Sequence, residues 1–313
     1  MRFSNLDPTH RPHRPGDIFR WGVTDPLRGK RRTASPGPPA PRTEPDLEAI
    51  HDGSQRPRLT WIGHSSFLAG LGGRSLLIDP VFSGRVAVVC PRYGEPGLRP
   101  PDLPKLSAVF ITHSHYDHLD RASLIAVPRN VPALVPLGLG SWFRRWNRRP
   151  VTELDWWQTT EIDGLRVTLV PSRHWSRRGV LDVNRTLWGG FVIECEGEAI
   201  YHAGDSAAFD GFAEIGRRFP GLLAAMLPIG GYRPAWFMEK QHMNPEQAGE
   251  AFLELDARVL VPMHWGAFQL TDEPISEPAE RMRDWWMGRA DGFGRKILQI
   301  PAVGETIFLN DVA

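Results

Sequence analysis

The sequence predicts an α/β protein in which helices cover β-sheets, and two observations carry this prediction. Short apolar runs that end in polar loops dominate from residue 58 onward. Several of these runs lack polar alternation, as is typical of strands that are covered on both faces. Segments with helix-start signals lie between and after the runs. This mixture indicates a layered architecture in which sheets are covered by helices.

The expected strands are apolar runs, and most are followed at once by His, Asp, Gly or Ser. They cover residues 58–63, 74–80, 106–112, 132–137, 165–172, 186–195, 198–205 and 257–265. Polar side chains that recur at the ends of buried strands are natural candidates for a shared site.

The expected helices are recognised by their first residues. One covers 120–127, where Asp120 is a suitable N-cap. The segment 244–255 begins with Asn and then Pro, an N-terminal signature that 276–290 repeats. The stretch "WFRRWNRR" (142–149) is expected to be a helix that ends in solvated arginines, which favour its dipole. The alternative for this stretch is contact with an anionic lipid surface.

The chain divides at about residue 57. The stretch "GKRRTASPGPPAPRTEPD" (29–46) is rich in proline, charge and small residues, a composition that does not support a packed core. We therefore expect residues 1–57 to be an N-terminal extension, partly extended or mobile. Residues 58–313 are long enough to form one large domain.

Composition bounds the function. A net charge of +1 lacks the basic excess of nucleic-acid binders, so no nucleic-acid partner is expected. Cys90 and Cys195 form no CxxC pair, which favours a reducing compartment. The first sixteen residues lack the apolar core of a secretory signal, and no run reaches the roughly 20 apolar residues of a membrane span. We expect a cytoplasmic protein and leave peripheral membrane contact open.

The stretch "ITHSHYDHLD" (111–120) concentrates metal-capable side chains after a buried strand. His113 and His115 are two residues apart, so they point the same way in an extended conformation. Asp117 and His118 follow where the chain should turn into a helix, which suggests two pairs of ligands for two adjacent cations. Imidazole and carboxylate without thiolate are typical of catalytic zinc sites.

Further candidate ligands follow other predicted strands. His174 lies in "VPSRHW", Asp205 in "YHAGDS" and His264 in "VPMHW". The cluster and these three partners together predict a metal site. His64 and Asp79 are expected to be supporting residues, either structural or as hydrogen-bond partners of the ligands.

The series "HSHYDH", "SRHW", "AGD" and "MHWG" resembles the ligand series of the metallo-β-lactamase superfamily. The resemblance implies a four-layer αββα sandwich with two metal ions between the sheet edges. It implies two Zn²⁺, with Mn²⁺ or Fe as alternatives, and a hydroxide that bridges them. It assigns the first metal to His113, His115 and His174, the second to Asp117, His118 and His264, and a bridging role to Asp205.

Longer motifs are similar to one branch of this superfamily, the N-acylphosphatidylethanolamine-hydrolysing phospholipase D family and its bacterial relatives. They are "TWIGHSSFL" (60–68), "ELDWW" (153–157), "LPIGGYRPAWFM" (227–238) and "QHMNPEQA" (241–248), within a similarity that covers roughly residues 56–310. The branch implies a binuclear zinc phosphodiesterase. A lactonase or another carboxyl-ester or amide hydrolase is the alternative, because fold does not fix substrate. A non-enzymatic metal-holding protein is the third hypothesis.

The resemblance also suggests which residues meet the substrate. Asp117 would orient the hydroxide or accept its proton, and His242 would serve in acid/base chemistry. The expected substrate contacts are Gln241, His242, Trp236, Phe237, Met238 and Arg177. For Trp236, Phe237 and Met238 the alternative is simple packing, and for Arg177 it is solvation. The expected partners are a small-molecule or phospholipid-like substrate and a second copy of the chain in a homodimer.

Overall fold

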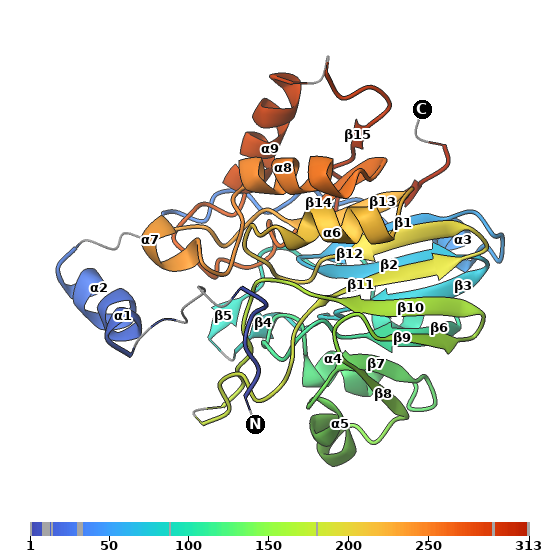
Figure 1. Ribbon diagram of the computed structural model, residues 1–313, viewed down its shortest axis with the longest axis horizontal. Coiled ribbons are helices and arrows are strands. Elements are labelled where there is room, and N and C mark those ends of the chain that lie inside the picture. The colour runs from blue at the N-terminus through green and yellow to red at the C-terminus, as the bar shows by residue number, and fades with distance from the viewer. Residues whose placement is uncertain are drawn as a thin grey trace.

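The computed structural model describes residues 2–7, 13, 15–29, 34–87, 89–179, 181–289 and 292–311. Within these residues, two seven-stranded sheets face one another and carry helices on their outer sides (Figure 1). The predicted αββα architecture is therefore confirmed. A short two-stranded ribbon stands apart from both sheets: β4 (Arg85–Val86) and β5 (Cys90–Pro91).

The first sheet is formed by strands from the N-terminal half of the chain, with one strand from near the C-terminus at its edge. Its strand order is β16 (Thr306–Phe308), β1 (Arg58–Gly63), β2 (Ser66–Leu71), β3 (Arg74–Ile78), β6 (Leu106–Phe110), β7 (Ala133–Pro136) and β8 (Val151–Leu154). The second sheet has the order β15 (Ile297–Leu298), β14 (Val259–Met263), β13 (Ala224–Pro228), β12 (Glu198–His202), β11 (Gly190–Cys195), β10 (Leu165–Val170) and β9 (Thr159–Ile162).

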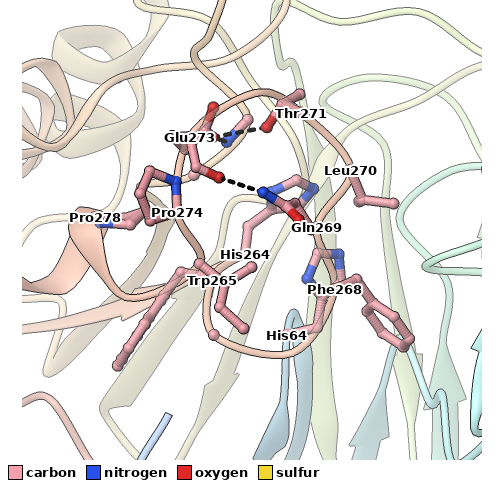
Figure 2. A pocket seen from close by; sticks show the side chains of 14 residues that line it. His64, His264, Trp265, Phe268, Gln269, Leu270, Thr271, Glu273, Pro274 and Pro278 are labelled. Atoms are coloured by element: carbon pink, nitrogen blue, oxygen red, sulfur yellow. Dashed lines mark hydrogen bonds between the residues drawn. The ribbon is translucent and has the colours of Figure 1, made fainter. Parts of the chain in front are cut away.

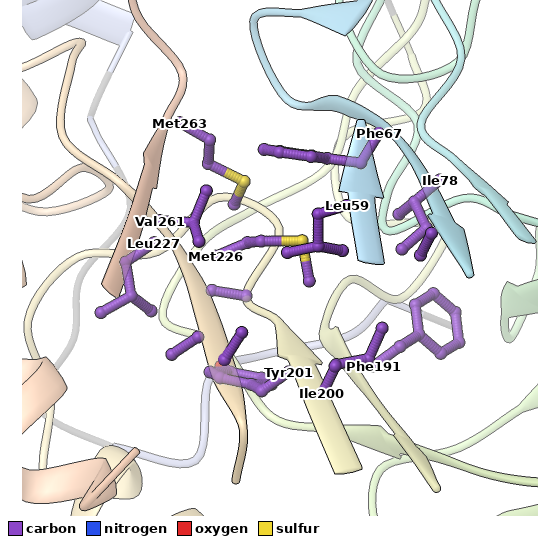
Figure 3. Close-up of a cluster of buried hydrophobic side chains, with 14 of the residues drawn as sticks. Leu59, Phe67, Ile78, Phe191, Ile200, Tyr201, Met226, Leu227, Val261 and Met263 are labelled. Carbon is purple, nitrogen blue, oxygen red and sulfur yellow. The ribbon is translucent and has the colours of Figure 1, made fainter. Parts of the chain in front are cut away.

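Period-two alternation divides the side chains of the first sheet between two cores. In β2, Phe67 and Ala69 enter the core between the sheets, whereas Leu68 joins the core beneath the outer helices. Figure 3 shows the inner core, where Phe67 and Ile78 lie opposite residues such as Met226 of the second sheet. Both faces of the first sheet are thus covered, which explains why the predicted strands read as continuous apolar runs.

Helices cover the outer faces of both sheets. α4 (Arg121–Ala126) and α5 (Gly140–Trp146) lie on the first sheet, while α6 (Gly211–Arg218), α8 (Pro245–Leu255) and α9 (Glu277–Met287) lie over the second (Figure 1). The remaining helical elements are α1 (Pro15–Phe19), a π-helical turn (Arg20–Thr24), α2 (Asp25–Leu27), α3 (Leu47–His51), a 3₁₀ turn (Pro100–Asp102) and α7 (Ala235–Met238).

The helix-start predictions are confirmed in detail for α4 and α8, whereas Ser276 before α9 makes no side-chain capping hydrogen bond. Asp120 caps α4 by accepting a hydrogen bond from the backbone N–H of Ser123 at 3.0 Å. Asn244 caps α8 in a capping box with Gln247, and Pro245 occupies the first helical position. These caps fix where each helix begins relative to the loops before it.

The predicted strands exist, but most end earlier than their apolar runs. β6 ends at Phe110, β12 at His202 and β14 at Met263, so the residues that follow are loop rather than strand. The run 186–195 enters the sheet only at Gly190. Strands β2, β8, β9, β13, β15 and β16 were not predicted, nor was the ribbon of β4 and β5.

Parallel pairing brings the important strand ends to one edge. In the second sheet β12, β13 and β14 are parallel neighbours, and in the first sheet β3, β6 and β7 are. The loops after β6, β10, β12 and β14 therefore converge at the same end of the two sheets, where ligands of α/β proteins usually bind.

The prediction of solvated arginines in 142–149 is wrong for Arg149. Its side chain is 4 % exposed, and its guanidinium donates to the backbone carbonyls of Leu124 at 2.7 Å and Val131 at 3.2 Å. The chain leaves α5 at Arg148 with φ 58°, which turns the next residue inward. Arg149 thus binds carbonyls at the end of α4 instead of facing solvent.

Part of the predicted extension lies against the domain. The backbone N–H of Phe3 donates to the carbonyl of Asn184 at 2.8 Å, and that of Thr43 to Val303 at 2.9 Å. The expectation that residues 1–57 are partly extended or mobile also covers 8–12, 14 and 30–33, which lie outside the described residues. None of the helices in the described part of the chain has the length and apolarity of a membrane span.

Candidate metal centre

The loop after β6 folds back on itself and presents both of its first histidines to one point. It bends instead of staying extended, so His113 offers Nε2 and His115 offers Nδ1, 2.9 Å apart. His174 follows β10 and brings its Nε2 to 3.2 Å from the same His115 nitrogen. Together with Asp205 these side chains form a first group, whose ligand atoms all lie within 4.8 Å of one another.

A second group lies beside the first. Asp117 and His118 come from the turn before α4, and His264 follows β14. The Nε2 atoms of His118 and His264 lie 3.6 and 3.5 Å from Asp117 Oδ2. His64, from the turn between β1 and β2, completes this group. The residues predicted as ligands are therefore brought together, and His64 joins them.

Asp205 links the two groups. Its Oδ2 lies 3.7 Å from the Nε2 atoms of His113 and His174, and 3.2 Å from those of His118 and His264. The loop that carries it is packed tightly, because a Cβ on Gly204 would meet the Cβ of Thr112 at 2.8 Å. One carboxylate oxygen thus faces two histidines of each group.

Outer hydrogen bonds fix which ring nitrogens face inward. His118 Nδ1 donates to Asp79 at 2.7 Å, and His174 Nδ1 donates to the carbonyl of Gln241 at 2.9 Å. The Thr112 hydroxyl donates to Asp79 at 2.6 Å, so it accepts from His113 Nδ1 at 3.0 Å. These bonds leave the Nε2 lone pairs of three histidines pointing into the centre, an arrangement typical of metal-ligating imidazoles.

The convergence of lone pairs fits a cation. His115 Nδ1 faces the Nε2 atoms of both His113 and His174, and one proton on it can satisfy at most one of them fully. The buried Nε2 atoms of His118 and His264 have no hydrogen-bond partner. A positive ion placed among these atoms would contact them all, and imidazole with carboxylate suits zinc, manganese or iron.

The electrostatics of the centre also call for positive charge. Burial opposes ionisation of Asp205, yet His118 and His264 outweigh it and hold the pKa of Asp205 well below its usual range. Burial likewise opposes charge on His264, but Asp205 and Asp117 raise its pKa to about 9. The two buried carboxylates thus favour positive charge on the imidazole beside them, and bound metal cations would supply that positive charge.

The supporting residues lie in strained backbone. His64, Asp79 and His264 have φ values of 57°, 43° and 63°, a region that non-glycine residues rarely adopt. The backbone N–H of His264 donates to the carbonyl of His64 at 3.1 Å, which joins the two sheets beneath the centre. Strain of this kind persists where surrounding contacts over-determine it, and it clusters at functional sites.

The loop after β14 covers this side of the centre. Figure 2 shows it arching from Trp265 to Pro278 over His64 and His264. Glu273 anchors the loop by accepting from the Thr271 hydroxyl at 2.7 Å and from the backbone N–H of Gly231 at 2.6 Å. The loop thereby covers the back of the second group.

A cavity of about 570 Å³ opens at the centre. His115, Asp117, Asp205 and His264 line it, and Gln241, His242 and Arg177 also reach it. His242 stands between the groups, with its ring 5.2 Å from that of His174 and 5.1 Å from that of His264. Burial lowers the pKa of His242 to about 3, so its ring is neutral.

The predicted apolar contacts divide between the cavity and its surroundings. Phe237 and Met238 line the cavity. Trp236 does not belong to the described lining; its ring lies against Phe237 and under the guanidinium of Arg20. Arg177 and Arg178 both line the cavity, and Arg178 also donates to the carbonyl of Ser114 at 3.0 Å.

Sequence reasoning missed Asn5. Its amide donates to the carbonyl of His174 at 2.9 Å, and its oxygen accepts from the His174 N–H at 3.1 Å. The same oxygen accepts from the indole of Trp188 at 3.2 Å. Asn5 thus fixes the backbone of a candidate ligand from 169 positions away, and no motif in the N-terminal residues signals this.

Comparisons with known proteins agree with this geometry. The family model described as a β-lactamase superfamily domain matches residues 74–265. A metallo hydrolase of the archaeon Ignicoccus hospitalis has a similar structure, with a TM-score of 0.58 and 25 % identity over 80 % of this chain and 97 % of that one.

Two curated relatives extend the similarity beyond the matched domain. An uncharacterised protein of Mycobacterium tuberculosis is 36 % identical over 291 residues, which are 90 % of this chain and 77 % of the relative. An N-acyl-phosphatidylethanolamine-hydrolysing phospholipase D of Caenorhabditis elegans is 33 % identical over 250 residues, 74 % of this chain and 70 % of the relative.

Proposed function

This chain belongs to the β-lactamase superfamily of metal-dependent hydrolases, and we propose that it is a binuclear phosphodiesterase acting on a phospholipid-like substrate. The observation that carries the proposal is the position of Asp205, whose Oδ2 lies within 3.7 Å of four histidine nitrogens. Two of these nitrogens belong to each group, so the centre fits two cations that share one carboxylate.

The first ion would be held by His113, His115 and His174, and the second by Asp117, His118 and His264. Two such cations, most simply zinc, lower the pKa of a water molecule and neutralise charge on a phosphoryl oxygen. The similarity to the phospholipase D of C. elegans supports a phosphodiester rather than a lactone as substrate.

The chain's own residues would orient the reactants. Asp117 accepts a hydrogen bond from His64 at 3.0 Å and is held ionised, so its carboxylate can orient a water molecule by accepting a hydrogen bond from it. The neutral ring of His242 reaches the cavity beside both groups, where it can donate a hydrogen bond to a substrate oxygen. Arg177 lines the same cavity and supplies a guanidinium that matches phosphate geometry.

The test combines metal analysis with turnover. The purified protein is assayed on bis-p-nitrophenyl phosphate and N-acylphosphatidylethanolamine, before and after chelation and after loading with zinc, manganese or iron. We expect two metal ions per chain and metal-dependent hydrolysis. Asp205→Asn should lower turnover by about 10²-fold or more, because the linking charge is lost.

Asp284→Asn is the matched control, since Asp284 is exposed on α9. A metal-loaded protein that hydrolyses a panel of lactones and no phosphodiester would contradict the proposed substrate. A protein that holds metal and turns over neither class would contradict hydrolysis altogether.

A further inference from the structure

The N-terminal helical segment, residues 15–27, lies beside α7 (Figure 1). The indole of Trp21 stacks on the ring of Phe237, with centroids 4.9 Å apart and planes at 3°. His13 stacks on the same ring at 3.8 Å, and its Nε2 donates to the Phe237 carbonyl at 2.6 Å. The segment therefore contacts α7 through parallel rings.

A second contact fixes the segment in place. The guanidinium of Arg20 lies 4.3 Å above the ring of Trp236, and its Nε donates to Asp25 at 3.2 Å. Trp236 thus has a role that the sequence did not suggest: it receives the extension instead of lining the cavity.

Trp21 lines the same cavity as the candidate ligands. The same lining includes the apolar side chains of Val86, Leu270, Phe237 and Met238. It also includes the imidazoles and carboxylates of the metal centre. A cavity that combines a charged centre with apolar walls fits a substrate whose hydrolysed polar group carries an apolar chain.

We propose that Trp21 and Phe237 form the wall of a subsite for a linear alkyl or acyl chain, so that the N-terminal segment selects the substrate. Trp21 lies outside residues 74–265, the part that the family model matches. The proposal rests on the proposed function only in placing the hydrolysed group at the metal centre.

The segment also carries exposed apolar side chains that can serve as control positions. Phe19 and Leu27 are 59 % and 83 % exposed, so they face solvent and not the cavity. Phe19→Ala removes an aromatic ring from the same segment without touching the subsite, and it is therefore the matched control for Trp21→Ala. Trp21→Phe keeps a ring that can stack on Phe237.

The experiment measures kcat/KM for alkyl p-nitrophenyl phosphates with chains of one to twelve carbons. We expect the native protein to gain about fourfold per methylene until the subsite is full, as burial of one CH₂ predicts. Trp21→Ala should flatten this dependence, because it should lower kcat/KM for the long-chain substrates far more than for the methyl substrate, whereas Phe19→Ala and Trp21→Phe should preserve most of it.

Calorimetric affinities for methylphosphonate and octylphosphonate give a readout that needs no turnover. If no phosphodiester is hydrolysed, but octylphosphonate binds more tightly than methylphosphonate and Trp21→Ala abolishes the difference, the proposed function fails and the subsite stands. A loss in Trp21→Ala that is equal for short and long chains, or equal in Phe19→Ala, would overturn the subsite.

Discussion

His64 Nε2 lies 3.0 Å from Asp117 Oδ2, and both side chains are buried beside the second ligand group. The ring of His64 also packs against that of His264 at 4.2 Å between centroids. Its ring also meets that of His118 edge-on at 5.7 Å, so His64 contacts all three side chains proposed to hold the second metal ion. Its Nε2 donates to the carboxylate, so the nitrogen that faces the centre is already engaged.

We expect His64 to orient Asp117 rather than bind metal. His64→Ala should lower metal affinity at the second position or activity by about 10- to 100-fold, the usual cost of removing a partner of a ligand. His64→Gln places an amide N–H near the same carboxylate and should recover part of the loss. Metal content at saturating zinc should stay at two ions per chain in both variants; a fall to one ion would identify His64 as a ligand.

Asp79 is the second supporting residue. It accepts from His118 Nδ1 at 2.7 Å and, through its other oxygen, from the Thr112 N–H at 2.8 Å. Asp79→Asn keeps the shape but can turn a donor toward His118, which disturbs the tautomer that points Nε2 at the centre. We expect zinc affinity to fall by about 10- to 100-fold and the free energy of unfolding by about 1–3 kcal/mol.

Thr112→Val provides a comparison for Asp79→Asn. It removes one hydrogen bond to the same carboxylate and the hydroxyl that accepts from His113, but leaves the contact between His118 and Asp79 in place. Zinc titration followed by calorimetry should show weakening mainly at the first position in Thr112→Val and at the second in Asp79→Asn. If both variants lost zinc affinity at the same position, Thr112 and Asp79 would not support different metal positions.

Removal of metal should destabilise the fold. Asp117 and Asp205 are buried among histidines with converging lone pairs, so bound cations stabilise the folded chain and not the unfolded one. We expect chelation to lower the melting temperature by several degrees, since about 1 kcal/mol shifts Tm by roughly 2–4 °C in a chain of this size. Scanning calorimetry before and after reloading checks this; an unchanged Tm would argue that no resident metal stabilises the native state.

The strand runs and helix caps were predictable because they depend on local patterns. The convergence of the candidate ligands was predictable because His174, Asp205 and His264 each follow an apolar run. Asn5 and Trp21 were not, because they reach the site by long-range contacts to His174 and Phe237 that no local spacing encodes.

The same limit explains Arg149. In the sequence it is one of four arginines within 142–149, and its neighbours are exposed. Its burial follows from the turn at Arg148 and from carbonyls of α4, which lies 20 or more residues earlier in the chain.

Arg149 should be important for stability rather than for lipid contact. Burial lowers its pKa to about 10, so it stays charged and needs its carbonyl partners. Arg149→Ala leaves the carbonyls of Leu124 and Val131 without this donor and should cost roughly 2–4 kcal/mol of unfolding free energy. Arg129→Ala, at an exposed position, should change stability by less than about 0.5 kcal/mol in denaturant titration; equal losses would contradict the structural role.

Docking of the N-terminal segment should weaken in acid because of His13. Burial against Phe237 lowers the pKa of His13 below its ordinary value, with Lys240 lowering it further and the Phe237 carbonyl and Asp17 opposing the shift. A histidine whose pKa is lowered when docked binds a proton more readily when released. The docked form is therefore favoured above the ordinary histidine pKa and loses that advantage as pH falls below it.

Hydrogen exchange of residues 15–27, corrected for intrinsic rates, should be faster at pH 5.5 than at pH 7.5. His13→Gln can still donate to the Phe237 carbonyl but does not titrate, so its exchange should not depend on pH. If His13→Gln shows the same acid response as the native chain, another group controls the docking.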